Sequence, residues 1–338
     1  MSLAIGRERE KITYKVGINL CYKTFYRKSE DITSNKLYVV PLASVTFSLP
    51  LKQKISFFYQ YLTWMAGIDQ LTKLPNVSST TTVRMPSHIK NPTSIMPKLT
   101  STYSFIRPIT QTSVFVTVAY SRTGHGMRLA INQNGTANST YWDDNGHSKS
   151  ANLTISATQG MMAIPIDTKF SLRWNYNKGT SLFNDKANIT RSQSIGGSVT
   201  FSSRFKGSWN GELFTSYNQN LMHNNLNDLS CKHRRWEEWI KISFVKNKWI
   251  CWMKLALTKT YNRGNEIAED DELTNLACCI ERKFGNFSIK LEGENLLNLH
   301  SYTLQDSYLT TYSMAIYKYD RRPVFIMLSL NMYLEPYN

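Results

Sequence analysis

Apolar residues alternate with polar or small residues along most of the chain. In residues 12–22, every second residue from Ile12 to Tyr22 is apolar, and the residues between them are mostly polar or small. An alternation of period two places successive side chains on opposite faces of a β-strand, whereas a helix repeats every ~3.6 residues. The pattern therefore predicts a strand with one apolar face and one polar face.

The same alternation recurs up to the end of the chain. Further stripes lie at 45–49, 55–61, 114–120, 153–157, 170–176, 249–257, 287–291 and 324–334. Weaker candidates lie near 199–205, 209–217 and 239–245, and most candidates are followed by turn-forming residues. The chain is therefore predicted to be all-β, with on the order of 12–14 strands.

Strand length and connector length together favour one architecture. Strands of soluble sandwiches centre on about 5–6 residues, whereas a tilted strand needs about 9–11 to cross a bilayer, and several stripes reach that length. The connectors at 51–54 and 282–286 are tight, and those at 63–112, 219–238 and 294–322 are long and polar. Short turns on one rim and long loops on the other predict an antiparallel up-and-down transmembrane β-barrel.

In such a barrel, the apolar stripes face lipid and the residues between them face a wet interior. The residues expected to face lipid are Ile12, Tyr14, Val16, Ile18, Leu20, Phe170, Leu172, Trp174, Val324, Ile326, Leu328 and Leu330. Aromatic residues at the strand ends are expected at the level of the lipid headgroups, namely Tyr22, Tyr61, Trp174, Tyr176, Trp249 and Tyr333.

Composition adds a preference for anionic partners. The chain of 338 residues carries a formal net charge of +16, and its 41% hydrophobic and 12% aromatic residues argue against disorder. The basic residues are scattered, and the one cluster, 232–235, is interpreted as part of a solvated loop rather than a phosphate site. Membrane lipid and lipopolysaccharide are therefore expected partners, and nucleic acid is not.

No sequence motif for catalysis is found. There is no phosphate-binding P-loop, no nucleophile elbow, and no pair of histidines at the spacing of metal ligands. The five cysteines are scattered and predict no disulfide framework. We therefore expect no enzyme activity, cofactor or metal.

The carboxy-terminal region carries motifs of a known family. Residues 286–298, followed by Arg321-Arg322-Pro323 and a closing strand, resemble the last hairpin of TonB-dependent receptors and related Bacteroidota-type outer-membrane barrel proteins. The matching motif residues are Asn295, Leu296, Leu297 and Asn298 of an N-L-[LF]-N turn, Arg322 and Pro323 of the hairpin, and Asn91, Pro92 and Pro97 of a loop similar to G-N-P-x-L-K-P-E.

The resemblance implies a role in substrate uptake across the outer membrane. A complete receptor of this type also has a signal peptide, a plug domain and TonB as a partner, and neither a plug nor a signal peptide is found in residues 1–338. The whole chain is therefore expected to be the carboxy-terminal portion of such a barrel, without a plug domain and unable to transport alone. Its ligand is not indicated.

Two other classes of function remain open. The chain could be a non-transport binding or scaffold β-protein, either a soluble sandwich or a barrel remnant that displays loops. An outer-membrane hydrolase on a smaller barrel ranks last, because it requires a catalytic constellation that the sequence does not show. The apolar stripes distinguish a soluble sandwich from a transmembrane barrel, because in a sandwich the stripes face each other across a dry interior.

Overall fold

The fold consists of strands throughout. The computed structural model describes residues 2–27, 32–65, 75–79, 82–89, 93–134, 137–161, 164–226, 228–264, 268–297, 303–309, 314–320 and 324–332. Within these residues, no helix is long and apolar enough to cross a membrane.

In the described residues nineteen strands are defined, and most of them are long. They are β1 (Ser2–Glu8), β2 (Ile12–Arg27), β3 (Ile32–Leu49), β4 (Gln53–Met65), β5 (Asn76–Ser79), β6 (Thr82–Arg84), β7 (Thr93–Arg107), β8 (Thr112–Asn134), β9 (Ala137–Met161), β10 (Ile166–Phe183), β11 (Lys186–Ser203), β12 (Trp209–Asn224), β13 (Leu229–Lys246), β14 (Trp249–Gly264), β15 (Ala268–Phe284), β16 (Phe287–Glu294), β17 (Thr303–Leu309), β18 (Met314–Asp320) and β19 (Phe325–Met332).

One large antiparallel sheet contains almost all of these strands. From β1 to β4, on through β7 to β16 and finally β19, each strand pairs antiparallel with the next. The short β5 and β6 join this sheet through a parallel pairing of β6 with β9, which makes it 17-stranded, and β17 and β18 form a separate hairpin.

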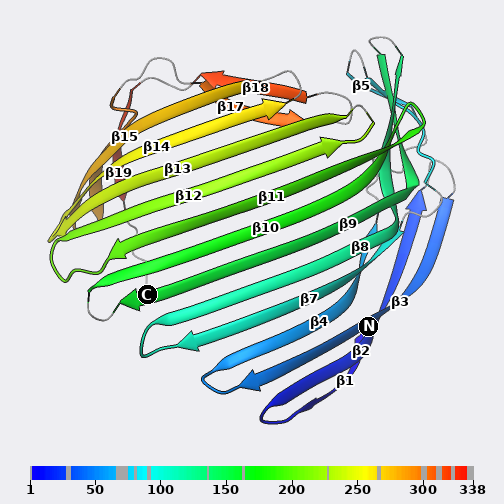
Figure 1. Ribbon diagram of the computed structural model, residues 1–338, viewed down its shortest axis with the longest axis horizontal. Helices are drawn as coiled ribbons and strands as arrows, with labels where there is room; N and C mark the ends of the chain where they lie inside the picture. Colours follow the sequence, from blue (N-terminus) through cyan, green and yellow to red (C-terminus); the bar gives the residue numbers. More distant parts are fainter. Residues whose placement is uncertain are drawn as a thin grey trace.

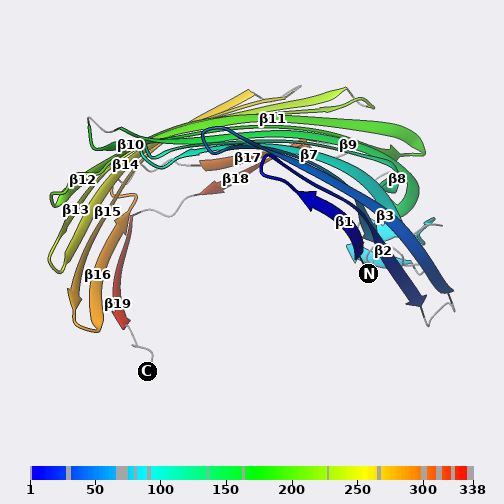
Figure 2. The same cartoon turned by 90° about the horizontal axis from the view of Figure 1, so that it is seen from below.

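The sheet is curved and open. Figure 1 shows its strands side by side in an oblique up-and-down array. Figure 2 shows that the array bends into an arch, with β1 to β3 in one limb and β16 and β19 in the other. In the described part of the chain, β1 pairs only with β2 and β19 only with β16. The arch therefore has two free edges.

The predicted fold class is confirmed, and the number of strands is higher than predicted. In the described residues an all-β, antiparallel up-and-down sheet is found; its continuous series, β1–β4, β7–β16 and β19, has 15 strands rather than roughly 12–14, and β5 and β6 bring the sheet to 17. Strands such as β1 escaped prediction because charged residues interrupt their alternation, and β5 and β6 because they have only four and three residues.

Two of the predicted long loops are wrong. The region 63–112 contains β7, and in the region 219–238 β12 continues to Asn224 and β13 begins at Leu229. At the ends of β12 and β13 that lie beyond the apolar stripes, most residues are polar on both faces, so the pattern of period two is lost although the strands continue. The region 294–322 includes the β17–β18 hairpin.

The predicted tight turns are confirmed. β3 ends at Leu49 and β4 begins at Gln53, and only Gly285 and Asn286 separate β15 from β16. Gly285 has a φ of +56°, a conformation that costs glycine little. We call the rim of the sheet that carries these tight turns the turn end. The opposite rim, where β4 ends and β7 begins, is the loop end.

Candidate functional site

The pairing register aligns the apolar stripes of neighbouring strands. Residues that stand directly opposite each other in an antiparallel pair point to the same face of the sheet. Val16 of β2 stands opposite Ala43 of β3, and Trp174 of β10 stands between Leu153 of β9 and Ile195 of β11. The same holds at the other edge, where Leu291↔Leu328 and Ile289↔Leu330 join β16 to β19. One side of the sheet, the apolar face, thus carries a continuous apolar band.

The residues expected to face lipid share this face. Following the register from β2 through β10 to β19 places on the apolar face Ile12, Tyr14, Val16, Ile18, Leu20, Phe170, Leu172, Trp174, Ile326, Leu328 and Leu330. Val324 lies just before β19. Several of these side chains are well exposed, with 58% of Val16 and 72% of Leu328 accessible. No other part of the described chain packs over them.

The apolar band runs obliquely to the hydrogen-bonded rows. The row that contains Leu172 of β10 passes through Tyr217 and Trp236 and reaches Lys259 of β14. On β14 the apolar stripe lies nearer to the turn end, at 249–257. Because the strands are tilted, a level apolar band crosses neighbouring strands at positions that shift along the rows. This shift is the stagger of strands in a barrel wall.

The opposite, polar face is rich in Ser, Thr and Asn. Hydroxyl and amide groups bond across neighbouring strands on this face. The bonds are Ser121–Ser150 at 2.6 Å, Ser171–Ser198 at 2.7 Å, and Asn175 Nδ2 to Ser194 Oγ at 3.1 Å. Such a surface suits contact with water or with a hydroxylated solute.

Burial identifies the polar face as the inside of the arch. The small residues Ala119, Ala277, Cys279 and Ser288 all lie on the polar face and are buried. The β17–β18 hairpin, which contacts β13 and β15, also lies on the inside of the arch in Figure 2. Side chains converge on the concave side of a curved sheet and diverge on the convex side. The apolar face is therefore the convex face of the arch in Figure 2.

Aromatic and then basic residues follow the apolar band toward the loop end. On the apolar face, Tyr176 is followed by Lys178 along β10, and Tyr261 by Arg263 along β14. Of the aromatic residues expected at headgroup level, those on the apolar face are Tyr22, Tyr61, Trp174, Tyr176 and Trp249, while Tyr333 lies outside the described residues.

The interpretation of 232–235 as a solvated loop is wrong. These residues lie within β13 and pair with both β12 and β14. Lys232 and Arg234 point to the apolar face, and His233 and Arg235 point to the polar face. Four consecutive polar residues resemble a loop in sequence, but both neighbouring strands satisfy their backbone groups.

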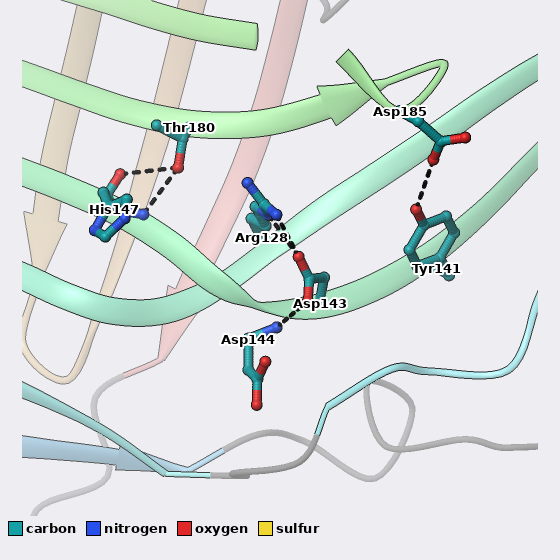
Figure 3. Close-up of polar contacts among 7 residues, drawn as sticks. All are labelled: Arg128, Tyr141, Asp143, Asp144, His147, Thr180 and Asp185. Atoms are coloured by element: carbon teal, nitrogen blue, oxygen red, sulfur yellow. Dashed lines mark hydrogen bonds and ion pairs between the residues drawn. The ribbon is translucent and has the colours of Figure 1, made fainter. Parts of the chain in front are cut away.

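A polar cluster joins β8, β9 and β10 beyond the apolar band (Figure 3). Asp143 accepts a hydrogen bond from Arg128 Nε at 2.7 Å and also lies 2.6 Å from the second guanidinium nitrogen of Arg128, and both side chains are largely buried. Thr180 Oγ1 accepts a hydrogen bond from the His147 backbone N–H at 2.8 Å. The His88 backbone N–H donates to the Trp142 carbonyl at 2.8 Å, which holds the segment after β6 against β9. Specific hydrogen bonds and an ion pair therefore hold the strands together at the loop end.

Tyr141 of β9 also belongs to this cluster. Its hydroxyl donates to Asp185 Oδ1 at 3.1 Å, and its ring lies 4.7 Å from that of His88, between centroids. Burial raises the pKa of Tyr141, and the hydrogen bond to Asp185 raises it further. The phenol therefore remains a donor at neutral pH.

The family motif residues are only partly described. Pro97 lies in β7 opposite Tyr61, just before the β7–β8 ladder begins at Lys98, where a missing N–H is tolerated. Asn295 is buried with a φ of +52°, and its N–H donates to Asn275 Oδ1 at 2.9 Å. Leu296 and Leu297 complete this turn. The motif residues Asn91, Pro92, Asn298, Arg322 and Pro323 lie outside the described residues.

Comparison with known proteins adds little to this picture. No protein-family profile and no curated protein matches the chain. The ferric-catecholate import receptor Fiu of E. coli K12, in its open form, is similar with a TM-score of 0.40 and 8% identity, over 98% of this chain and 78% of that chain. The toluene transporter TodX of P. putida is similar with a TM-score of 0.26 and 8% identity, over 89% and 86%. TM-scores this low carry no argument, so the functional proposal rests on the residues.

Proposed function

We propose that the sheet is the wall of an outer-membrane β-barrel that takes part in substrate uptake. The continuous apolar band on the convex face carries this proposal. Exposed apolar surface on this scale is unfavourable in water and favourable against acyl chains. The strands satisfy one another's backbone groups, which is the condition that hydrocarbon imposes on a spanning structure.

The concave face supports transport rather than mere anchoring. Its hydroxyl and amide groups form a wettable surface, as in barrels whose interior conducts solutes. The resemblance of the Asn295 turn to TonB-dependent receptors supports an uptake protein of that type, which would have a plug and TonB as further partners. On this proposal the chain is the carboxy-terminal portion of the barrel and does not transport alone.

The alternative is a non-transport binding or scaffold protein. A soluble sandwich requires a second sheet packed about 10 Å from the apolar face. In the described chain, the only strands outside the large sheet are the short β17 and β18. A barrel remnant that displays its loops fits the same sheet, and transport assays separate it from an uptake protein.

Partitioning into membranes tests the proposal. The full chain, produced in an outer-membrane-containing host, should require detergent for solubility and should float with phospholipid vesicles in a density gradient. Release of the protein by plain buffer as a dispersed monomer would exclude the membrane wall and would leave the scaffold alternative. Leu328→Arg puts a charge on the apolar face and should float less. Ser329→Arg is the control, because it puts the same charge on the polar face and should still float.

A further inference from the structure

A group of basic residues lies on the apolar face just beyond the band, toward the loop end. This basic cluster consists of Lys178, Arg191, Lys232, Arg234 and Arg263. Lys178 stands directly opposite Arg191, and Lys232 directly opposite Arg263. Like charges directly opposite each other destabilise a sheet. Two such pairs with only β12 between them indicate that the sequence accommodates an anion here.

The chain itself neutralises only part of this charge. Arg263 makes an ion pair with Asp270, in which a second guanidinium nitrogen lies 2.9 Å from Asp270 Oδ2. Arg234 donates to the uncharged Gln219 at 3.1 Å. Within the described residues, Lys178, Arg191 and Lys232 have no carboxylate partner. A surplus of positive charge therefore remains on the outer wall.

Arg191, Lys232 and Arg263 of the basic cluster line one cavity. The cavity has a volume of about 610 Å³, and its lining includes Tyr176, Arg191, His223, Lys232 and Arg263. Arg191 is exposed and Lys232 is half-buried, so both cations are accessible from outside. A guanidinium and an ammonium group beside one cavity are suited to bind a phosphate through charge-assisted hydrogen bonds.

The height of the cluster matches that of lipid headgroups. Along β10, β13 and β14 an aromatic residue and then basic residues follow the apolar band, as with Trp236 followed by Arg234 and Lys232 on β13. Aromatic rings prefer the membrane interface, and long basic side chains extend from it toward the headgroups. The loop end of an outer-membrane barrel faces the outside, where the leaflet is built of phosphorylated glycolipid.

We propose that the basic cluster binds the phosphate groups of a phosphorylated lipid headgroup of the lipid A class, with Arg191 and Lys232 as its anchors. This inference rests on the proposed function, because the apolar band must lie in the membrane for the cluster to meet a headgroup. The attraction is electrostatic and weakens as ionic strength rises.

Binding of lipid A to the full chain in a neutral detergent tests the proposal. The double variant Arg191→Ala/Lys232→Ala should bind diphosphorylated lipid A roughly 10- to 30-fold more weakly than the parent chain. The control is Arg107→Ala/Lys246→Ala, which removes the same charge from the same face at the turn end, and it should bind within about twofold of the parent.

Three results would overturn the inference. These are equal weakening in the control variant, equal binding of dephosphorylated lipid A, and displacement of lipid A by inorganic phosphate at the same concentration, which would identify free phosphate as the ligand. If the double variant does not fold, the single variants Arg191→Gln and Lys232→Gln should each weaken binding roughly fivefold, and unchanged binding would also refute the site.

The two proposals fail in different ways. A chain that is a soluble monomer in plain buffer contradicts the membrane wall, whatever its affinity for lipid A. A chain that floats with vesicles but binds lipid A equally in parent and variant contradicts only the headgroup site.

Discussion

Leu328 and Ser329 are neighbours on β19 that point to opposite faces of the sheet. Leu328 lies on the apolar face opposite Leu291, and Ser329 lies on the polar face opposite Lys290. If the apolar face meets lipid, Leu328→Arg should lower the free energy of unfolding by about 2–4 kcal/mol at mid-membrane depth. Ser329→Arg should cost much less. Urea unfolding of the chain in vesicles, followed by tryptophan fluorescence, measures both.

The amino-terminal stripe provides a second comparison. Val16→Arg should be costly, and Lys15→Arg on the opposite face should be nearly neutral. Gly17 lies on the same face as Lys15, but the structure excludes it as a second control position. A Cβ at Gly17 would lie 2.5 Å from the Leu3 carbonyl oxygen of β1, so any side chain there would disturb the edge strand whatever its polarity. Equal cost at Val16 and Lys15 would contradict a lipid-facing stripe.

Asp270 has a pKa that depends on one neighbour. Its hydrogen bonds with the Arg263 guanidinium lower the pKa of Asp270 below its ordinary value. The ion pair therefore contributes to stability above the pKa of the unfolded carboxyl, near 3.9, and this contribution is lost as pH falls through the lower folded value. Arg263→Gln should return the titration of Asp270 to the ordinary range, which carboxyl NMR measures. An unchanged titration would show that Arg263 is not the cause.

The extension of β8 and β9 beyond the apolar band depends on the pair Arg128–Asp143. The two side chains are 17% and 13% exposed, so removal of one partner leaves a poorly solvated charge. Asp143→Asn should make local opening of the extension easier by about 2–3 kcal/mol. Amide hydrogen exchange in β8 and β9 measures this change.

The control for this element replaces both partners. Arg128→Leu/Asp143→Leu leaves no uncompensated charge and should cost clearly less than Asp143→Asn. If the double variant opens more easily than the single variant, the attraction between Arg128 and Asp143 itself stabilises the extension, beyond the neutralisation of one charge by the other.

Elements with clean alternation were predictable from sequence, and others were not. Residues 12–22 were identified because every second residue is apolar, and the register then adds a fact that no single strand contains, namely that all the stripes share one face. The basic cluster could not be found in this way. Lys178, Arg191 and Lys232 are distant in sequence and meet only through the pairing of β10 to β13. The ion pairs of the loop end depend on the register in the same way.

Strand direction decides how the whole sheet can close. Every step from β1 to β19 through the sheet is antiparallel, and the number of steps is even, so β1 and β19 run in the same direction. If these two edges paired directly, they would form a parallel ladder. Barrels of bacterial outer membranes have even numbers of strands and are antiparallel throughout, so closure of that kind needs an odd number of further strands.

A transport-incompetent chain is therefore expected when these residues are reconstituted alone. A free edge in hydrocarbon carries unpaired backbone groups that cost several kcal/mol each, so these residues alone are not expected to form a closed, conducting wall. Proteoliposomes with the chain should show no faster swelling in isotonic sugar solutions than protein-free vesicles, and an intact porin in the same lipid is the positive control. Sugar entry dependent on the chain would contradict this expectation, and it would arise either from direct closure of β1 on β19 or from leakage around an open edge. Cysteines introduced at Ile5 and Leu328 would cross-link only in the first case, which separates direct closure from leakage around an open edge.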